Sequence, residues 1–412
     1  MITMIDQYGT ATDSSSEWSA KEAYPFQTSA EESVASQKTS SFNRISQIID
    51  RLKTNVKQRV TSGNPLYTDI TFFRKTIDRN IYGYNATTSL CGTENDLNDP
   101  RDLVVLHESG FLSFVYDDGD ITIPMNNVQS FDRYLTDRGI DFLLFIPPYK
   151  AGEIDSSYSD VYHDYSSELL HDIVQNAHQY GVDVINYMDI AEDEGLSEED
   201  LYFRTDHHWL PQSGLRGCTA ISSWLIDRGY EVDTERFNLE SYNIGYSEHP
   251  MLGSQGIKTT SAYTDVEFMP ILEPLYPTDL TVTNAQAGTT LTGSIVDTLY
   301  DYSMIQTPSL DSTKHFQFYS YGDPPLLQIH NNQRTDGKRI LVIKDSFARV
   351  MVPYMCNMAE YVDVIDLRHF NGSLKTYIDE NTPDSVIIIY AVGTFIDKSH
   401  YVTRSQYAFN FD

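Results

Sequence analysis

The chain of 412 residues contains only three cysteines, Cys91, Cys218 and Cys356, and no CxxC spacing. Three widely separated cysteines form neither a disulfide framework nor a recognisable metal site, so we expect them to be buried as small hydrophobic side chains. Hydrophobic runs are also short. No segment approaches the roughly 18 consecutive apolar residues that span a bilayer. The first residues lack the basic region and apolar core of a secretory leader, so we expect either a cytosolic protein or one whose leader has been removed.

Basic residues are scarce, with 29 Lys and Arg against 59 Asp and Glu, and the formal net charge is -30. A field of this sign repels phosphate backbones and anionic surfaces, which makes nucleic acid and other polyanions poor partners. Hydrophobic residues make up 40% of the chain and charged residues 21%. This balance is typical of a globular protein, and the length allows two or three domains.

From residue 126 the sequence alternates between helical and strand periodicity, which predicts a parallel sheet covered by helices on both faces. The expected strands are 142–146, 182–187, 339–343, 362–365 and 385–389. The expected helices run from about 128 to Gly139, from Ser166 or Ser167 to Gly181, from Pro211 to Gly229, and from about 347 and 373 onwards. The sequence therefore predicts an α/β fold.

Three other segments differ from this pattern. Residues 1–41 are polar and aperiodic and predict a tail or tether. Residues 42–125 predict an N-terminal helix followed by an irregular extension with short strands at 103–106 and 121–123. Residues 236–336 are rich in Tyr, Thr, Pro and Gly and predict a β-rich insertion, with strand-like runs at 280–282 and 316–319. The insertion divides the α/β domain into a first part, 126–235, and a second part, 337–412.

Ser346 follows the apolar run 340–343 and precedes a predicted helix, so its hydroxyl should stand at the carboxyl edge of the parallel sheet, where α/β enzymes bind ligands. Backbone N–H groups of that helix can stabilise an oxyanion. The alternative is that Ser346 only caps the helix. Asp206 and His208 are one residue apart in a loop, so the carboxylate can hold the imidazole as a base for the serine. These residues predict a Ser–His–Asp triad.

Other residues near these motifs are candidates for substrate binding. His207 either makes a structural hydrogen bond or contacts substrate. Five further residues lie at predicted strand ends or beside the triad, where a surface or packing role is the alternative: Tyr149, Lys150, Arg204, Arg368 and His369. Tyrosines of the insertion either stack on sugar rings or belong to the core; these are Tyr242, Tyr246, Tyr263, Tyr300, Tyr302, Tyr319 and Tyr321.

Four short motifs together resemble one family. They are Asp206-His207-His208-Trp209, Lys344-Asp345-Ser346-Phe347, Ile146-Pro147-Pro148-Tyr149-Lys150 and Asp366-Leu367-Arg368-His369-Phe370. The chain resembles the DHHW family, within the SGNH-like hydrolases that include the periplasmic O-acetyltransferases of alginate biosynthesis. The resemblance implies a flavodoxin-like, three-layer αβα domain. It also implies that Ser346 is the nucleophile, His208 the general base and Asp206 its orienting carboxylate, with no metal and no cofactor.

The resemblance further implies acyl transfer, most simply of acetyl, to or from hydroxyls of an extracytoplasmic polysaccharide. The partners implied are a glycan, an acyl donor and, in some relatives, a membrane-bound acyl-transfer protein. The location implied is secreted, periplasmic or cell-surface. The Gly and Asn blocks that complete the oxyanion hole of ordinary SGNH enzymes are not found in this sequence, so the second oxyanion donor is unassigned.

Two other classes of function fit parts of the sequence. The letters Asp-His-His also occur in manganese phosphoesterases of the DHH family, whose two-metal centres need further Asp and His ligands. The other strand ends offer only Asp345, Asp366 and His369. A non-catalytic glycan-binding or scaffold protein on the same fold is the remaining alternative.

Overall fold

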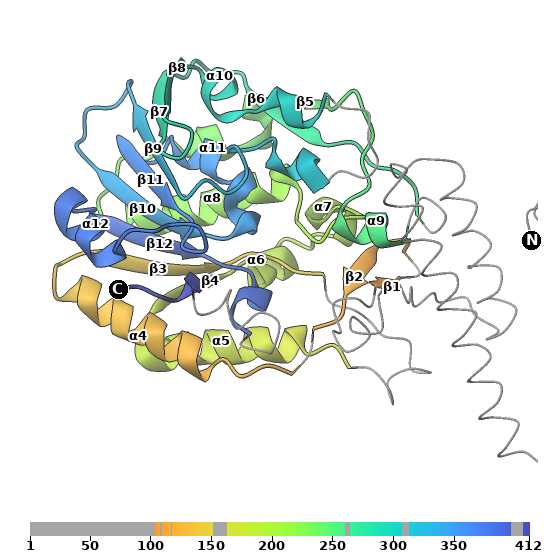
Figure 1. The fold of residues 1–412 in the computed structure, drawn as a ribbon, viewed down its shortest axis with the longest axis horizontal. Helices are drawn as coiled ribbons and strands as arrows, with labels where there is room; N and C mark the ends of the chain where they lie inside the picture. Colours follow the sequence, from red (N-terminus) through yellow and green to blue (C-terminus); the bar gives the residue numbers. More distant parts are fainter. Residues whose placement is uncertain are drawn as a thin grey trace, which may run out of the picture.

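The computed structural model describes residues 104–107, 109–116, 118–150, 163–259, 264–306, 313–396 and 407–412. The expected tail, the expected N-terminal helix, Cys91 and Tyr263 lie outside these residues. The described part is a mixed α/β fold around one large sheet, in agreement with the sequence-based prediction (Figure 1). Cys218 and Cys356 are buried, as predicted.

The central sheet has the strand order β4-β3-β12-β10-β11-β9-β7-β8. Its first five strands are parallel: β4 (Asp183–Asn186), β3 (Asp141–Ile146), β12 (Ser385–Ile389), β10 (Arg339–Lys344) and β11 (Tyr361–Ile365). The other three are antiparallel to their neighbours: β9 (Leu326–Asn331), β7 (Leu280–Asn284) and β8 (Thr289–Gly293). All five parallel strands were predicted from their short apolar runs, which are typical of strands buried on both faces.

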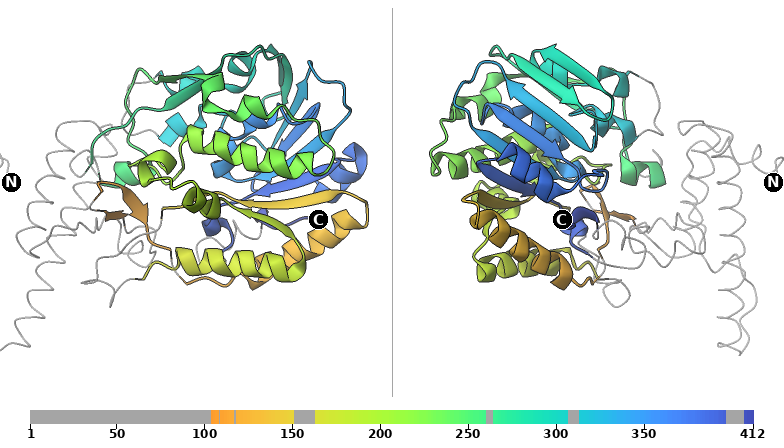
Figure 2. Two further views of the ribbon diagram at one scale, coloured as in Figure 1. Left: turned by 180° about the vertical axis from the view of Figure 1, so that it is seen from behind. Right: turned by 60° about the vertical axis from the view of Figure 1, so that its left-hand side comes forward.

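Helices cover both faces of the sheet (Figures 1 and 2). One face packs against α4 (Thr122–Thr136), α5 (Ser166–Tyr180) and α12 (Leu374–Asn381). The other packs against α6 (Tyr187–Asp193), α8 (Pro211–Ile226) and α11 (Val352–Met355). Alternate residues of β3 enter the two cores: Phe142 and Leu144 face α4 and α5, whereas Leu143 and Phe145 face the other side. This alternation follows from the two-residue period of a strand.

The segment expected as a β-rich insertion supplies five strands. Two of them, β5 (Tyr242–Tyr246) and β6 (Pro270–Pro274), form a separate antiparallel ribbon. The other three, β7, β8 and β9, extend the central sheet beyond β11. The insertion also contains two short helices, α9 (Ser254–Thr259) and α10 (Ile295–Leu299). It is therefore built onto the same sheet as the α/β part.

The remaining elements are short. They are β1 (Val104–Leu106), β2 (Leu112–Phe114), α7 (Glu198–Leu201) and the 3-10 turns η3 (Thr234–Phe237), η4 (Leu239–Ser241), η5 (Tyr302–Met304), η6 (Thr313–Gln317), η7 (Ser346–Val350) and η8 (Val392–Thr394). β1 and β2 form an antiparallel pair, and Leu112 donates its N–H to the Arg204 carbonyl, 2.8 Å away. This bond joins the pair to the loop that contains Asp206.

Several local predictions were wrong. The run 121–123 is not a strand, because Asp120 accepts the Thr122 N–H at 2.8 Å and starts α4 there. The run 316–319 is likewise not a strand, because its first two residues belong to η6 and the Phe318 N–H donates to the His315 carbonyl at 3.0 Å. Ser166 is the first residue of α5 instead of its cap, since the Asp164 carboxylate accepts the Ser166 N–H. At Thr122 and at Ser166 a short contact from an aspartate side chain favours the start of a helix at that residue.

Candidate active site

Ser346 stands where it was predicted, at the carboxyl edge of the sheet directly after β10, but it does not cap a helix. Asp345 performs that role. Its Oδ1 accepts the Phe347 N–H at 2.9 Å, and its Oδ2 accepts the Ala391 N–H at 2.8 Å and the Thr394 hydroxyl at 2.7 Å. The expected helix is a five-residue 3-10 turn followed by α11. Because Asp345 caps the turn, the Ser346 hydroxyl remains available for another partner.

That partner is His208, whose Nε2 lies 2.8 Å from the Ser346 Oγ. The other ring nitrogen, Nδ1, lies 2.6 Å from the Asp206 Oδ1, which also accepts the His208 N–H at 2.9 Å. The Trp209 indole N–H donates to the Phe347 carbonyl at 2.8 Å and so ties the two segments together. Two stretches 138 residues apart in sequence thus meet in one continuous hydrogen-bonded chain.

The charges of this chain suit a base and its orienting carboxylate. His208 is buried and its ring stacks on Phe316, with centroids 3.8 Å apart. Burial lowers the pKa of His208 even though the Asp206 carboxylate opposes the shift. Burial alone raises the pKa of Asp206, but the adjacent His208 and His207 and the hydrogen bonds it accepts hold that pKa well below its usual range. At neutral pH the imidazole is therefore uncharged and the carboxylate ionised.

His207 lies beside His208, with ring centroids 3.8 Å apart, and 29% of its side chain is exposed. Its Nδ1 is 2.6 Å from the Ser254 Oγ, and Phe114 lies on its other side with centroids 5.9 Å apart. Burial, followed by the charge of His208, lowers the pKa of His207 to about 3. His207 is thus a neutral ring that borders His208 and reaches solvent.

The other predicted substrate-binding residues are engaged elsewhere in the described structure. Tyr149 is buried, and its hydroxyl lies 3.2 Å from the Ser167 Oγ of α5. Arg204 pairs with Glu199 at 2.9 Å, with 44% of its side chain exposed. Neither side chain makes a hydrogen bond or ion pair to the triad among the described residues.

Arg368 belongs to a buried ion cluster beside the site. It forms a bidentate pair with Asp366 and contacts Asp323 at 3.2 Å. Asp323 also binds Lys344 and Arg349, the latter through its Nε at 2.9 Å. Lys344 is the last residue of β10, and Asp366 is the first residue after β11. The cluster therefore fixes the loop before β9 against the sheet edge that carries Ser346.

Two groups among the described residues have the donor atoms for a metal ion, Asp206 with His207 and His208, and Asp323 with Asp366 and His369. In the first, Asp206 and His208 are already bonded to each other and to Ser346. In the second, the carboxylates are paired with Lys344, Arg349 and Arg368. The bonds these groups make fit a proton relay and a structural ion cluster better than a two-metal centre.

Sequence reasoning missed the residues that support the triad from the insertion. Ser254 donates its N–H to the Asp206 Oδ2 at 2.7 Å. Glu267 accepts the N–H groups of Arg204 and Thr205. The only local signal is Gly253, where a Cβ would lie 2.2 Å from the Asp206 Cβ, so only glycine fits. Contacts of this range leave no periodic trace in a single sequence.

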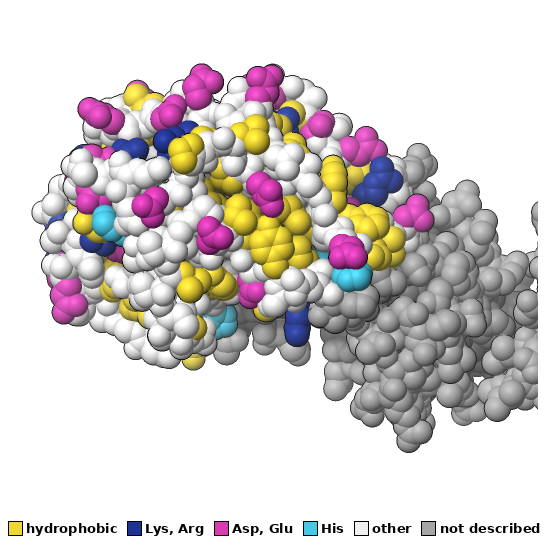
Figure 3. Space-filling view, turned by 90° about the horizontal axis from the view of Figure 1, so that it is seen from above, with side chains coloured by type: hydrophobic (Ala, Val, Ile, Leu, Met, Phe, Trp, Pro, Cys, Tyr) yellow, Lys and Arg dark blue, Asp and Glu magenta, His cyan; other side chains and the backbone are white. Residues whose placement is uncertain are grey.

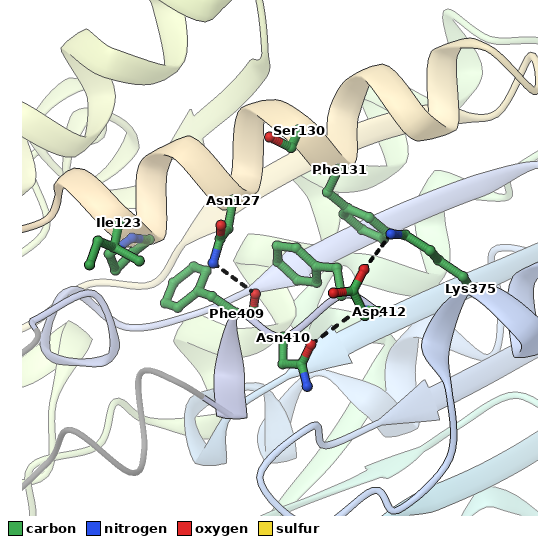
Figure 4. A pocket seen from close by; sticks show the side chains of 10 residues that line it. Ile123, Asn127, Ser130, Phe131, Lys375, Phe409, Asn410 and Asp412 are labelled. Atoms are coloured by element: carbon green, nitrogen blue, oxygen red, sulfur yellow. Dashed lines mark hydrogen bonds and ion pairs between the residues drawn. The ribbon is translucent and has the colours of Figure 1, made fainter.

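A pocket of about 250 Å³ lies between α4 and the segment 407–412 (Figure 4). Its lining includes Asn127, Lys375 and Asp412 but no triad residue. Lys375 pairs with Asp412 at 2.5 Å, and Asn127 donates to the Phe409 carbonyl at 3.2 Å, so residues on opposite walls of the pocket bind each other.

In the described part of the chain, no helix has both the length and the apolar character needed to cross a bilayer.

Two family models match the chain. A model described as DHHW protein matches residues 187–365, and one described as SGNH hydrolase-like domain, acetyltransferase AlgX, matches residues 115–243. The first match includes both Asp206 to Trp209 and Lys344 to Phe347. A search of curated proteins finds no match.

Solved structures share the fold. A DHHW family protein from Eubacterium siraeum is 18% identical with a TM-score of 0.54, and the match covers 74% of this chain and 94% of that one. PatB1 of Bacillus cereus is 20% identical with a TM-score of 0.57, over 75% of this chain and 99% of that one. PatB1 with a sulfonyl adduct gives 20% identity and a TM-score of 0.56, over 72% and 96%. The resemblance drawn from the motifs is thus confirmed: the chain carries the DHHW signature on the fold of the SGNH-like acetyltransferases.

Proposed function

We propose that this chain is a serine acyltransferase or esterase that moves an acyl group, most simply acetyl, to or from hydroxyls of an extracytoplasmic polysaccharide. The hydrogen-bonded chain Asp206–His208–Ser346 carries the proposal, because it joins an ionised carboxylate, a neutral imidazole and an alcohol at 2.6 and 2.8 Å. Such a chain turns a weak nucleophile into an effective one.

In the first half-reaction the Ser346 Oγ attacks the acyl carbonyl while its proton moves to the His208 Nε2. Asp206 stabilises the imidazolium that forms. As the tetrahedral intermediate collapses, the bond to the leaving alcohol breaks and His208 returns the proton to that alcohol, which leaves an acyl-serine. In the second half-reaction a sugar hydroxyl or water gives a proton to His208 and attacks the acyl-serine carbonyl. The bond between the acyl carbon and the Ser346 Oγ then breaks, and His208 returns the proton to that oxygen, which restores Ser346. Both acceptors use the same residues.

The oxyanion of the intermediate needs hydrogen-bond donors. The Ser346 N–H donates to no acceptor among the described residues, which makes it one candidate donor. His207 is a second candidate contact. If the Ser254 hydroxyl donates to His207 Nδ1, the ring carries its own proton on Nε2 and presents a neutral donor beside the base. Loss of one such donor typically slows catalysis by about 10²- to 10³-fold.

The substrate class rests on the acetyltransferase domain match, as do the extracytoplasmic location, the acyl donor and a membrane-bound transfer partner. Of the insertion tyrosines named above that the structure describes, Tyr246 has an exposed side chain, at 63%, whereas Tyr242, Tyr300 and Tyr319 are buried. Figure 3 shows the face that the insertion presents, where hydrophobic side chains gather among scattered acidic ones. Tyr246 is accordingly the tyrosine we assign to glycan contact.

The test uses p-nitrophenyl acetate as acyl donor and a sulfonyl fluoride as covalent probe, since PatB1 has been solved with a sulfonyl adduct. We expect hydrolysis with a pre-steady-state burst, and mass spectrometry should place the adduct on Ser346. Ser346→Ala should abolish both signals, whereas Ser303→Ala, an exposed serine of η5, should change neither.

Equal rates for wild type and Ser346→Ala would contradict the mechanism and favour a non-catalytic glycan-binding protein. Loss of activity on dialysis against a chelator, with recovery on adding manganese, would instead favour a metal-dependent phosphoesterase.

A further inference from the structure

The loop that carries Asp206 is held at its two ends by buried or half-buried charges of opposite sign. On one side, the Glu267 carboxylate, which lies just before β6, accepts the N–H of Arg204 at 2.5 Å and that of Thr205 at 2.6 Å, and also the Thr205 hydroxyl. Three donors therefore converge on one carboxylate. Their two peptide groups immediately precede the catalytic aspartate.

On the other side, the Lys150 ammonium donates to the Phe203 carbonyl at 2.9 Å and to the Gln255 Oε1 at 2.7 Å. Lys150 follows β3 and is 4% exposed. A cation thus holds the carbonyl end of the turn and an anion holds its N–H end, so each charge faces the partial charge that attracts it. Lys150 and Glu267 also attract each other.

The segment 253–256 completes the support. Gln255 and Gly256 donate their N–H groups to the Thr205 carbonyl at 3.0 and 2.8 Å, and Gly253 donates to the Thr205 Oγ1 at 3.0 Å. Just before this segment, the Met251 N–H donates to the Glu267 carbonyl at 2.7 Å. Every polar atom of Thr205 is therefore bonded to residues of the insertion.

We infer that Glu267 and Lys150 are positioning residues that fix the turn 203–206 and thereby preset the distance between the Asp206 carboxylate and the His208 imidazole. The inference gives the insertion a role in the proposed reaction. Its effect on turnover rests on the proposed function, whereas its effect on the geometry of the turn does not. Neither residue touches Ser346 or His208 through a hydrogen bond in the described structure. Glu267 acts through the backbone N–H groups of Arg204 and Thr205, and Lys150 acts through the Phe203 carbonyl and the Gln255 side chain.

Glu267→Gln is the most informative variant, because the amide has nearly the shape of the carboxylate but one acceptor oxygen in place of two. Its NH₂ group would face one of the N–H donors, so that hydrogen bond is lost. The matched control is Glu273→Gln in β6. Within the part of the chain that the structure describes, the Glu273 carboxylate accepts one hydrogen bond, from the Tyr302 hydroxyl at 3.0 Å. Glu267→Asp keeps both oxygens on a shorter side chain and serves as the rescue variant, or as the test variant if Glu267→Gln fails to fold.

The first readout is the far-downfield proton signal of the His208 Nδ1–H that bonds to Asp206, assigned by its loss in Asp206→Asn. We expect wild type and Glu273→Gln to show it and Glu267→Gln to lose or broaden it, with Glu267→Asp in between. A signal unchanged in both Glu267 variants would overturn the inference. This readout needs no turnover, so it stands even if Ser346→Ala shows that the proposed acyl chemistry is wrong.

The second readout is turnover of p-nitrophenyl acetate. A misplaced base slows the chemical step by about 10²-fold. We therefore expect kcat of Glu267→Gln to fall by about that factor with KM little changed, and kcat of Glu267→Asp to fall less. Where wild type is active and depends on Ser346, equal kcat values for Glu267→Gln and Glu273→Gln would also overturn the inference.

Discussion

Two neighbouring histidines differ in the groups that their ring nitrogens contact. His208 has Asp206 on Nδ1 and Ser346 on Nε2, so both nitrogens of its ring belong to the hydrogen-bonded chain that we propose as a proton relay. His207 has Ser254 on Nδ1 and lies partly in solvent. The sequence alone showed two equivalent imidazoles side by side. The spacing of one residue between Asp206 and His208 favoured the second of them, and the structure brings that one to the serine.

The pH dependence of the reaction follows from the burial of His208. A general base works only when uncharged, and burial lowers the pKa of His208 from its usual 6.5. Activity should therefore persist below pH 6.5 and fall as the pH drops through the lowered pKa. The measurement is kcat/KM for p-nitrophenyl acetate from about pH 4 to about pH 8. An acid limb centred above 6.5 would contradict this assignment.

The same titration must be separated from unfolding. Protonation of a buried neutral imidazole also destabilises the folded state. The contribution to stability is full above the ordinary pKa of 6.5, is lost as the pH falls from there through the lowered folded-state pKa, and does not change further below it. Denaturant unfolding at each pH serves as the control. The acid limb reports the base only where the protein is still folded.

At the scale of elements, the insertion contributes to the catalytic loop through a very close backbone approach. At Gly253 a Cβ would lie 2.2 Å from the Asp206 Cβ and 2.6 Å from its nitrogen. Gly253→Ala should therefore push the Asp206 backbone away, cost about 1–3 kcal/mol of unfolding free energy, and reduce turnover. Gly245→Ala in β5 is the control, since a Cβ there meets no atom within 4 Å. Similar activity and melting temperature for the two variants would argue against the close approach.

The ion cluster at the ends of β10 and β11 is a second contact between elements. Asp323 compensates Lys344, whose side chain is 1% exposed, as well as Arg349 and Arg368. Removing one partner of a buried pair leaves uncompensated charge, so Asp323→Asn should lower the unfolding free energy by about 3–5 kcal/mol. The measurement is urea unfolding.

Asp379→Asn provides the comparison. Asp379 pairs with Arg138 at 3.0 Å, but the two side chains are 55% and 38% exposed. Solvent screens such a pair, so this variant should unfold almost as wild type does. Equal destabilisation by the two substitutions would mean that the Asp323 cluster is not effectively buried.

The elements differ in how far the sequence alone predicts them. The five parallel strands have apolar runs, and α5 and α8 have a helical period, that are long enough to predict these elements. Gly181, with φ of 76°, ends α5 as predicted. The runs 121–123 and 316–319 were too short to predict. The first begins α4, where Asp120 accepts the Thr122 N–H, and the second begins within the 3-10 turn η6. Ser346, His208 and Asp206 could be proposed from local motifs, and the structure brings their side chains within hydrogen-bond distance. Glu267 and Ser254 act on residues 62 and 48 positions away, and no local pattern reveals such contacts.

At the scale of the whole molecule, the formal charge of -30 should affect which acyl donors approach. Like charges repel over about a Debye length, and salt shortens that length. We expect kcat/KM for an aryl ester with a carboxylate to rise when salt increases from about 20 mM to about 150 mM. The neutral p-nitrophenyl acetate is the control and should respond little. Identical responses of the two esters would show that the electrostatic field of the net charge does not affect the approach of the ester to the site.

The position of β12 has a consequence for biosynthesis. This strand comes after every other strand in the described sequence, yet it pairs with β3 on one side and β10 on the other. The half of the sheet that leads to Asp206 and the half that ends at Ser346 therefore have no common ladder until β12 arrives. During translation the two halves of the sheet cannot pair through β12, and their apolar edge strands stay unpaired, until residues 385–389 have left the ribosome exit tunnel. A nascent chain stalled before that point should be recognised by chaperones as incomplete.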